Sequence, residues 1–175
     1  MSVGSYISSL EADDIDALVA LVNSAYRGES SKKGWTTEAD LLDGIRTDAG
    51  SIHSLMSAPG SLILVYKDEN LKGCVYLHAQ KAALYLGMLT VAPDQQSRGI
   101  GKTLLQAAEL HALEQRCTTI VMTVIDVRKE LIAWYMRHGY KPTGEVKPFP
   151  ADPSFGIPRQ PLQFIVLEKE VIPVQ

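Results

Sequence analysis

The sequence lacks the features that mark several large classes of protein. It holds two cysteines, Cys74 and Cys117, with no CxxC motif and no histidine at a metal-binding spacing, so we predict neither a disulfide framework nor a metal site. No apolar run approaches the roughly 20 residues of a membrane-spanning helix. The N-terminus does not show the basic and apolar segments of a signal peptide. We therefore expect a cytoplasmic protein with reduced cysteines and no membrane segment.

An excess of positive charge is missing as well. The formal net charge is -3 and the isoelectric point about 5.8, so no broad basic surface for nucleic acid or for an anionic membrane is predicted. Hydrophobic residues make up 46% of the chain, which supplies enough apolar material for a buried core and excludes a disordered protein. Because no linker or repeat divides the 175 residues, residues 1–175 are predicted to form a single domain.

Strand and helix patterns follow one another in an informative order. Strand patterns lie at residues 6–9, 61–66, 71–79, 82–91, 118–124, 140–146 and 162–167. Helical patterns lie at residues 13–22, 101–116 and 128–138, and a further helix is expected to begin near residue 38, capped by Thr36 or Thr37. Locally paired strands come first and then alternate with helices. This order predicts an α/β domain of mixed α+β type, with helices packed on a mixed sheet.

The most specific motif is a glycine-spaced loop that joins a strand ending at Val91 to a helix. Its residues are Gln96, Ser97, Arg98, Gly99, Ile100, Gly101 and Lys102. The first amides of a helix are unpaired and carry a partial positive charge, and a glycine without Cβ lets an anionic oxygen approach them closely. Arg98 and Lys102 add positive charge beside them. The loop is therefore predicted to bind a pyrophosphate.

Other phosphate-binding loops match this segment less well. The chain has no GxxxxGK[ST] motif, which argues against a P-loop NTPase, and no GxGxxG motif near its N-terminus, which argues against a dinucleotide-binding domain. A purely structural role stays open, in which Gly99 and Gly101 only permit a tight turn and close helix packing.

Two segments together resemble one family. Residues 96–101 match the pattern Q/R-x-x-G-x-G/A of the GNAT N-acetyltransferase superfamily. Residues 133–140, Ala-Trp-Tyr-Met-Arg-His-Gly-Tyr, are similar to its second signature, an aromatic–Tyr pair followed by Gly-aromatic. The two segments stand about 40 residues apart in the order that the family shows, and the resemblance covers residues 6–169.

This resemblance implies a fold and a cofactor, acetyl-coenzyme A. The fold would be a mostly antiparallel mixed sheet of seven strands flanked by four helices. The strand at 82–91, bulged near Gly87, would splay from the strand at 118–124. Pantetheine would lie in the gap, bonded to the backbone of Leu89 and Val91, and the pyrophosphate would take the amides of residues 96–102.

The resemblance also implies an activity, the transfer of an acetyl group to a primary amine of a small molecule or peptide by direct attack. Tyr135 matches the family position that donates a proton to the departing thiolate. The chain departs from the family at two places. Tyr85 and Gly87 stand where many members carry an acidic base, and Arg128 stands where many carry asparagine. The base is therefore unassigned, and the candidates by residue type are Glu38, His78, Glu130 and water.

The acceptor site would be built from residues 26–42 and the loop at 146–161. Tyr26, Trp35 and Glu38 are its candidate contacts, with aromatic faces and an acid that could hold a cationic amine. Two alternatives to the transferase stay open: a non-catalytic module that binds acyl-coenzyme A, and a nucleotide-phosphate binder that uses the same loop. Homodimers are common among such domains, although the sequence identifies no interface.

Overall fold

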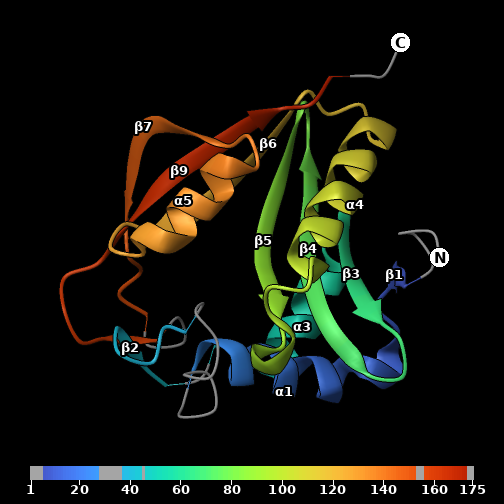
Figure 1. The fold of residues 1–175 in the computed structure, drawn as a ribbon, viewed down its shortest axis with the longest axis horizontal. Coiled ribbons are helices and arrows are strands. Elements are labelled where there is room, and N and C mark those ends of the chain that lie inside the picture. The colour runs from blue at the N-terminus through green and yellow to red at the C-terminus, as the bar shows by residue number, and fades with distance from the viewer. Residues whose placement is uncertain (1–5, 28–36, 45, 153–155, 173–175) are drawn as a thin grey trace.

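The computed structural model describes residues 6–27, 37–44, 46–152 and 156–172, and it arranges them around a seven-stranded sheet with helices on both faces (Figure 1). The strands of this sheet are β1 (Ile7–Ser9), β3 (Ser61–Lys67), β4 (Leu71–Gln80), β5 (Ala83–Val91), β6 (Thr119–Ile125), β7 (Lys141–Pro148) and β9 (Gln163–Glu170). The helices are α1 (Ile15–Tyr26), α3 (Ala49–Ser57), α4 (Ile100–Glu114) and α5 (Lys129–Arg137). Two short strands, β2 (Leu42–Asp43) and β8 (Ile157–Pro158), pair outside the main sheet.

The strand order is β1-β3-β4-β5-β6-β9-β7. β5 and β6 run parallel, and the other neighbouring strands run antiparallel. The predicted mixed sheet of seven strands, with four α-helices in the described part of the chain, is confirmed. Among these described helices, none is both long and apolar enough to span a membrane.

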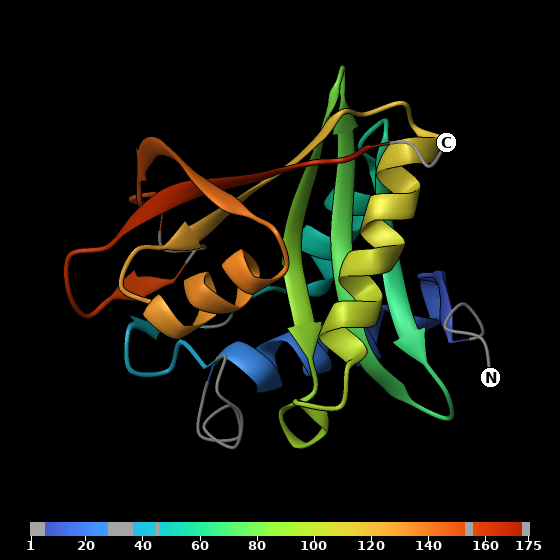
Figure 2. The same cartoon turned by 45° about the horizontal axis from the view of Figure 1, so that its top comes forward.

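The helices form a layer on each face of the sheet (Figures 1 and 2). α4 and α5 cover one face, where Leu104 and Leu131 belong to one buried apolar cluster. α1 and α3 cover the other face, where Leu18, Ile52 and Val65 belong to a second cluster. The sheet is therefore buried on both sides over its central strands, as an α/β layer architecture requires.

β5 and β6 pair over a short stretch and then separate. Their parallel register runs from Ala83 opposite Thr119 to Tyr85 opposite Val121, and both strands continue beyond it. Figure 1 shows β5 and β6 diverging toward their C-terminal ends, with α4 and α5 on either side of the gap. The splay that the family resemblance implies is thus present.

A β-bulge in β5 lies beside this gap. Cys74 of β4 lies opposite Thr90 and Tyr76 opposite Gly87, so β5 uses one more residue than β4 over the same stretch. Met88 sits in the bulge with a φ of 53°, a left-handed conformation that is uncommon for residues other than glycine. The bulge therefore lies immediately after Gly87, where it was expected.

The bulge also reverses which side chains of β5 face α4 and α5. Before it, Leu84 and Leu86 join the cluster on the α4 side. Met88 joins the opposite cluster, on the α1 side, and Leu89 returns to the α4 side. An ordinary strand would place residues 84, 86 and 88 on one face. The extra residue thus turns Leu89 toward the opening between β5 and β6.

The prediction of a helix that begins near residue 38 is wrong. The amides of Leu41 and Leu42 donate to the carbonyl oxygen of Glu38, at 2.9 and 3.0 Å, so the chain makes a single turn there. It then enters β2, where Leu42 lies opposite Pro158 and Asp43 opposite Ile157. The chain here forms a strand that pairs with a distant segment instead of a helix. A local sequence pattern cannot reveal such a pairing.

The helix of this region is α3, which the sequence pattern does not predict. Asp48 caps it by accepting the amide of Ser51 at 2.7 Å. Ile52 is its one buried residue, and Gly50 lies within its first turn. One buried position does not make a stripe of helical period, so the amphipathic pattern is too weak to indicate a helix.

Candidate active site

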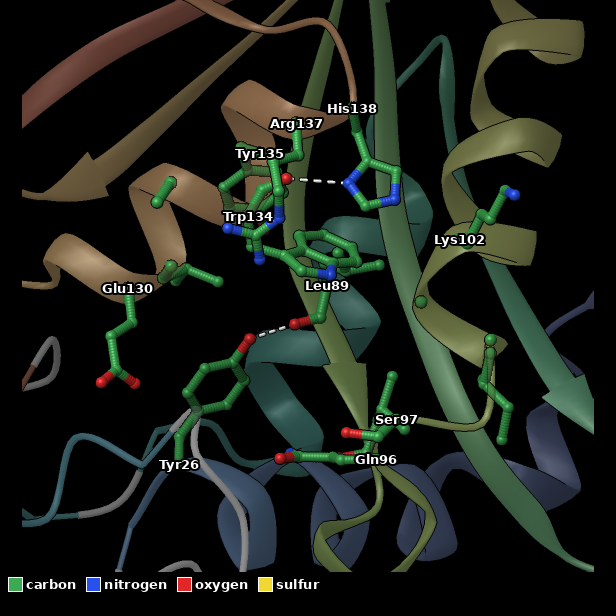
Figure 3. A pocket seen from close by; sticks show the side chains of 16 residues that line it. Tyr26, Leu89, Gln96, Ser97, Lys102, Glu130, Trp134, Tyr135, Arg137 and His138 are labelled. Atoms are coloured by element: carbon green, nitrogen blue, oxygen red, sulfur yellow. Dashed lines mark hydrogen bonds between the residues drawn. The ribbon is translucent and has the colours of Figure 1, made fainter.

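A cavity of about 450 Å³ opens where β5 and β6 separate, between the start of α4 and one face of α5 (Figure 3). We call it the first cavity. All but Arg98 of the residues predicted to hold the cofactor line it, namely Leu89, Val91, Gln96, Ser97, Gly99, Ile100, Gly101 and Lys102. α5 supplies the facing wall with Trp134 and Tyr135, together with His138, the residue that follows the helix.

The loop before α4 presents backbone amides to this cavity. Ser97 and Gly99 both have left-handed φ angles, 69° and 84°, which is the alternation that curls successive amides into an anion-binding nest. Gly99 is the N-cap of α4 and provides no side-chain cap, and the first turn contains no acidic residue. The amides at the start of α4 and their partial positive charge are therefore directed at the cavity.

The two glycines of the loop have different roles. A Cβ on Gly99 would meet nothing within 4 Å, so this glycine leaves open space as well as providing the left-handed turn. A Cβ on Gly101 would lie 3.2 Å from the indole ring of Trp134. Gly101 thus allows α4 and α5 to approach closely. The indole is flanked by His138, whose ring centroid lies 4.3 Å away.

Two carbonyl groups of β5 are held by side chains at the edge of the first cavity. The hydroxyl of Tyr26 donates to the carbonyl oxygen of Leu89, which lies in the stretch distorted by the bulge (Figure 3). The side-chain amide of Gln96 donates to the carbonyl oxygen of Val91 at 3.2 Å. These contacts fix the orientation of the β5 backbone where pantetheine is predicted to bind.

Tyr135 lies between the first cavity and a second one. Its side chain is 5% exposed, and it is packed edge-on against the rings of Trp134 and Tyr140. Burial raises the pKa of its hydroxyl well above the usual value of 10.0, so the phenol keeps its proton across the neutral range. Within the described ranges, the hydroxyl makes no hydrogen bond to another residue, which leaves it available to a ligand.

The second cavity, of about 240 Å³, lies on the other side of Tyr135. Tyr26, Tyr85 and Gly87 line it, together with a stacked pair of aromatic rings, Phe149 and Phe164, whose centroids lie 5.3 Å apart. Three arginines and one glutamate supply its charged side chains among the residues that the structure describes: Arg27, Arg46, Arg128 and Glu38.

A buried ion-pair network runs along this cavity. One carboxylate oxygen of Glu38 accepts from Nη2 of Arg27 at 3.0 Å, and the other accepts from Nη1 of Arg128 at 3.1 Å. The three side chains are between 5% and 9% exposed. Arg46 and Arg128 also approach the ring of Tyr26, with their guanidinium carbons 5.9 and 5.6 Å from its centroid.

The pairing of β2 with β8 joins two distant segments beside the second cavity. It joins the segment after α1 to the loop that follows β7, the two segments expected to build the acceptor site. Gly156 of that loop packs against Arg27, because a Cβ at this position would lie 2.7 Å from the guanidinium. Both predicted segments thus meet at the second cavity.

The remaining predicted residues are spread more widely. Trp35 lies outside the described residues. His78 bonds to the carbonyl oxygen of Pro59 at 3.0 Å and lines neither cavity, whereas Glu130 lines the first. In the part of the chain that the structure describes, no group of three or more potential metal ligands occurs. Arg27 lies within the predicted acceptor segment of residues 26–42 without being singled out as a contact, and Arg46 lies outside both predicted segments.

Comparison of the sequence with models of protein families identifies the family of this chain. The model of the acetyltransferase (GNAT) family matches residues 16–140, from α1 to the end of the second sequence signature. The chain belongs to the GNAT acetyltransferase family. The predicted family is therefore confirmed, and an acetyl-transferring enzyme is supported at the level of the family.

Solved GNAT structures share the fold over nearly the whole chain. The ribosomal-protein-S18-alanine N-acetyltransferase of Escherichia coli is 15% identical, with a TM-score of 0.70 and coverage of 97% of this chain and 95% of that one. An aminoglycoside 6'-N-acetyltransferase complexed with coenzyme A is 18% identical, with a TM-score of 0.69 and coverage of 97% and 98%. The ribosomal-protein-alanine N-acetyltransferase of Brucella melitensis is 20% identical, with a TM-score of 0.69 and coverage of 94% and 98%. No match was found among curated proteins.

Proposed function

We propose that this chain transfers the acetyl group of acetyl-coenzyme A to the primary amine of a small molecule or peptide by direct attack. The observation that carries the proposal is the position of Tyr135, which borders both cavities. The first cavity begins at an uncapped helix terminus and suits the coenzyme, and the second suits an acceptor. The proton donor would then stand where the two substrates meet.

The residues of the first cavity fit coenzyme A. The nest at Ser97 and Gly99 and the free helix terminus suit a pyrophosphate, and Lys102 adds a positive charge at the rim. Leu89 and Val91 offer strand backbone to an extended pantetheine arm. The open space at Gly99 leaves room for the phosphate oxygens. Acetyl-coenzyme A supplies a thioester, whose acyl carbon is open to attack by an amine and whose sulfur leaves as a thiolate.

Two proton transfers accompany this reaction. As the carbon–sulfur bond breaks and the carbon–nitrogen bond forms, the hydroxyl of Tyr135 donates its proton to the sulfur and later regains one from solvent. The proton of the attacking amine leaves through water in this proposal. Glu38 is held by two arginines through both of its oxygens, and His78 lines neither cavity, so neither is placed to take it.

The test is a calorimetric titration with acetyl-coenzyme A, followed by a thiol-release assay with a panel of amines. Gly99→Glu introduces a carboxylate and bulk where the pyrophosphate is expected. Gly144→Glu is the matched control. Gly144 of β7 also has a left-handed φ, 90° against 84°, and open space around its Cβ position, so the control adds the same charge at a residue with a similar φ.

The proposal expects micromolar binding that Gly99→Glu abolishes and Gly144→Glu preserves, with thiol release when an accepted amine is added. Absence of binding to the native protein would contradict the proposed cofactor site. Binding without thiol release for any amine would leave the alternative of a non-catalytic acyl-coenzyme A module.

A further inference from the structure

The described residues that line the second cavity include more basic than acidic side chains. Among the described residues that line it, three are arginines and one, Glu38, is an acid. Glu38 already engages Arg27 and Arg128 through its two oxygens. Arg46 makes no ion pair with any residue that the structure describes; its guanidinium lies instead 5.9 Å from the centroid of the Tyr26 ring. Excess positive charge in a partly enclosed cavity attracts an anion.

The arginines lie close enough to act on one another. Burial is the main cause that lowers the pKa of the Arg27 guanidinium, Glu38 raises it, and the charges of Arg46 and Arg128 lower it by less. Crowding like charges at a buried site is unfavourable unless a counter-charge is present. Glu38 supplies a counter-charge to Arg27 and Arg128, and a bound anion would supply one to Arg46.

The volume of the cavity suits a small carrier of the anion. Its volume of about 240 Å³ is room for roughly eight water molecules at about 30 Å³ each, which is the scale of a single amino acid. The stacked rings of Phe149 and Phe164 form an apolar wall. Tyr135 borders the cavity next to the coenzyme side. A ligand would thus contact cations, an apolar wall and the phenol at once.

We propose that the acceptor is a small primary amine that also carries a carboxylate, which Arg46 binds in the second cavity while the amine faces Tyr135. This inference rests on the proposed acetyl transfer and names its substrate class. The planar guanidinium of arginine matches a carboxylate with two parallel hydrogen bonds, which favours this anion over a diffuse negative charge. Amines that carry no carboxylate, whether otherwise neutral or polycationic, are disfavoured as acceptors.

The test compares matched pairs of acceptors in the thiol-release assay with acetyl-coenzyme A. Each pair is an amino acid and its own amide, taken from α-amino acids with small and apolar side chains and from β-alanine. The pairs differ only in the carboxylate. The amine of an amide has the lower pKa and is more often unprotonated, so a preference for the carboxylate cannot arise from amine reactivity.

We expect kcat/KM to favour the carboxylate member by at least about tenfold, as for a charge-assisted hydrogen bond. Arg46→Gln should reduce this ratio toward one. Arg116→Gln, which removes an exposed arginine beyond the far end of α4, should leave the ratio unchanged. Arg46→Lys should restore part of the ratio, because it returns the charge without the planar geometry.

The outcomes separate this inference from the proposed function. If acetyl-coenzyme A binds and amides react as well as carboxylates, the acceptor class is wrong and the transferase stands. The acceptor class is also wrong if the coenzyme binds and neither member of any pair reacts, or if Arg46→Gln leaves the ratio intact in a folded protein. If the coenzyme does not bind, the proposed function itself fails.

Discussion

Replacing Glu38 with glutamine tests how much the buried ion-pair network contributes to stability. The substitution Glu38→Gln keeps the shape of the side chain and its capacity for hydrogen bonds, but removes a negative charge that Arg27 and Arg128 share. All three side chains are at most 9% exposed, so water can screen the remaining arginines only weakly.

Removing one partner from a buried ion pair typically destabilises a protein by about 3–5 kcal/mol, because an uncompensated charge is left buried. For a domain of this size, each 1 kcal/mol lowers the melting temperature by about 2–4 °C. We therefore expect Glu38→Gln to melt roughly 6–20 °C below the native protein.

Circular dichroism would follow thermal unfolding of the native protein, Glu38→Gln and the control Glu168→Gln. Glu168 is exposed on β9, so its neutralisation should change stability by less than about 1 kcal/mol. A loss for Glu38→Gln as small as that of the control would refute the reasoning. It would mean that solvent, or rearrangement of the arginines, compensates the missing charge.

Three further predictions concern the site. Tyr135→Phe should lower kcat by about 10²–10⁴-fold while the Kd of acetyl-coenzyme A stays unchanged, and Tyr66→Phe, on remote β3, should alter neither; an unchanged kcat would remove the phenol from the mechanism. Burial keeps the pKa of Tyr135 above 10.0, so its phenol stays protonated at lower pH. Ionisation of Tyr135 should therefore not lower kcat below that pH, and any descending limb found there should persist in Tyr135→Phe. Gly101→Val should force Trp134 aside and weaken coenzyme binding by calorimetry, whereas Gly50→Val, with its nearest contact at 3.5 Å, should not; equal affinities would contradict the close packing of α4 and α5.

The sequence predicts best those parts of the molecule whose determinants are local. Residues 96–102 form a contiguous loop, so the glycine spacing alone indicates an anion site at the start of α4. The buried face of α4 follows from the spacing of Leu104, Leu105, Ala108 and Ala112, all of which are at most 2% exposed. Strands β3, β4, β5 and β6 are found within a residue or two for the same reason, since each carries its own apolar run.

The acceptor side is less predictable because distant segments create it. Arg27, Glu38 and Arg128 form one network, yet they come from the end of α1, a turn and the residue before α5. The β2–β8 pairing, which joins the segment after Glu38 to the loop that follows β7, has two residues in each strand and no recognisable pattern. In a single sequence, an arginine in a loop therefore cannot be told from a solvated surface residue.

The border between the two cavities has a kinetic consequence. Tyr26, Leu89, Leu131 and Tyr135 line both cavities, so the two spaces adjoin without coinciding. If the two substrates bind in these cavities as proposed, a ternary complex can form, and initial-rate plots at several concentrations of the second substrate should intersect rather than run parallel. Any cooperativity between the substrates would be transmitted across these four side chains, and by thermodynamic linkage each substrate would change the affinity of the other by the same factor.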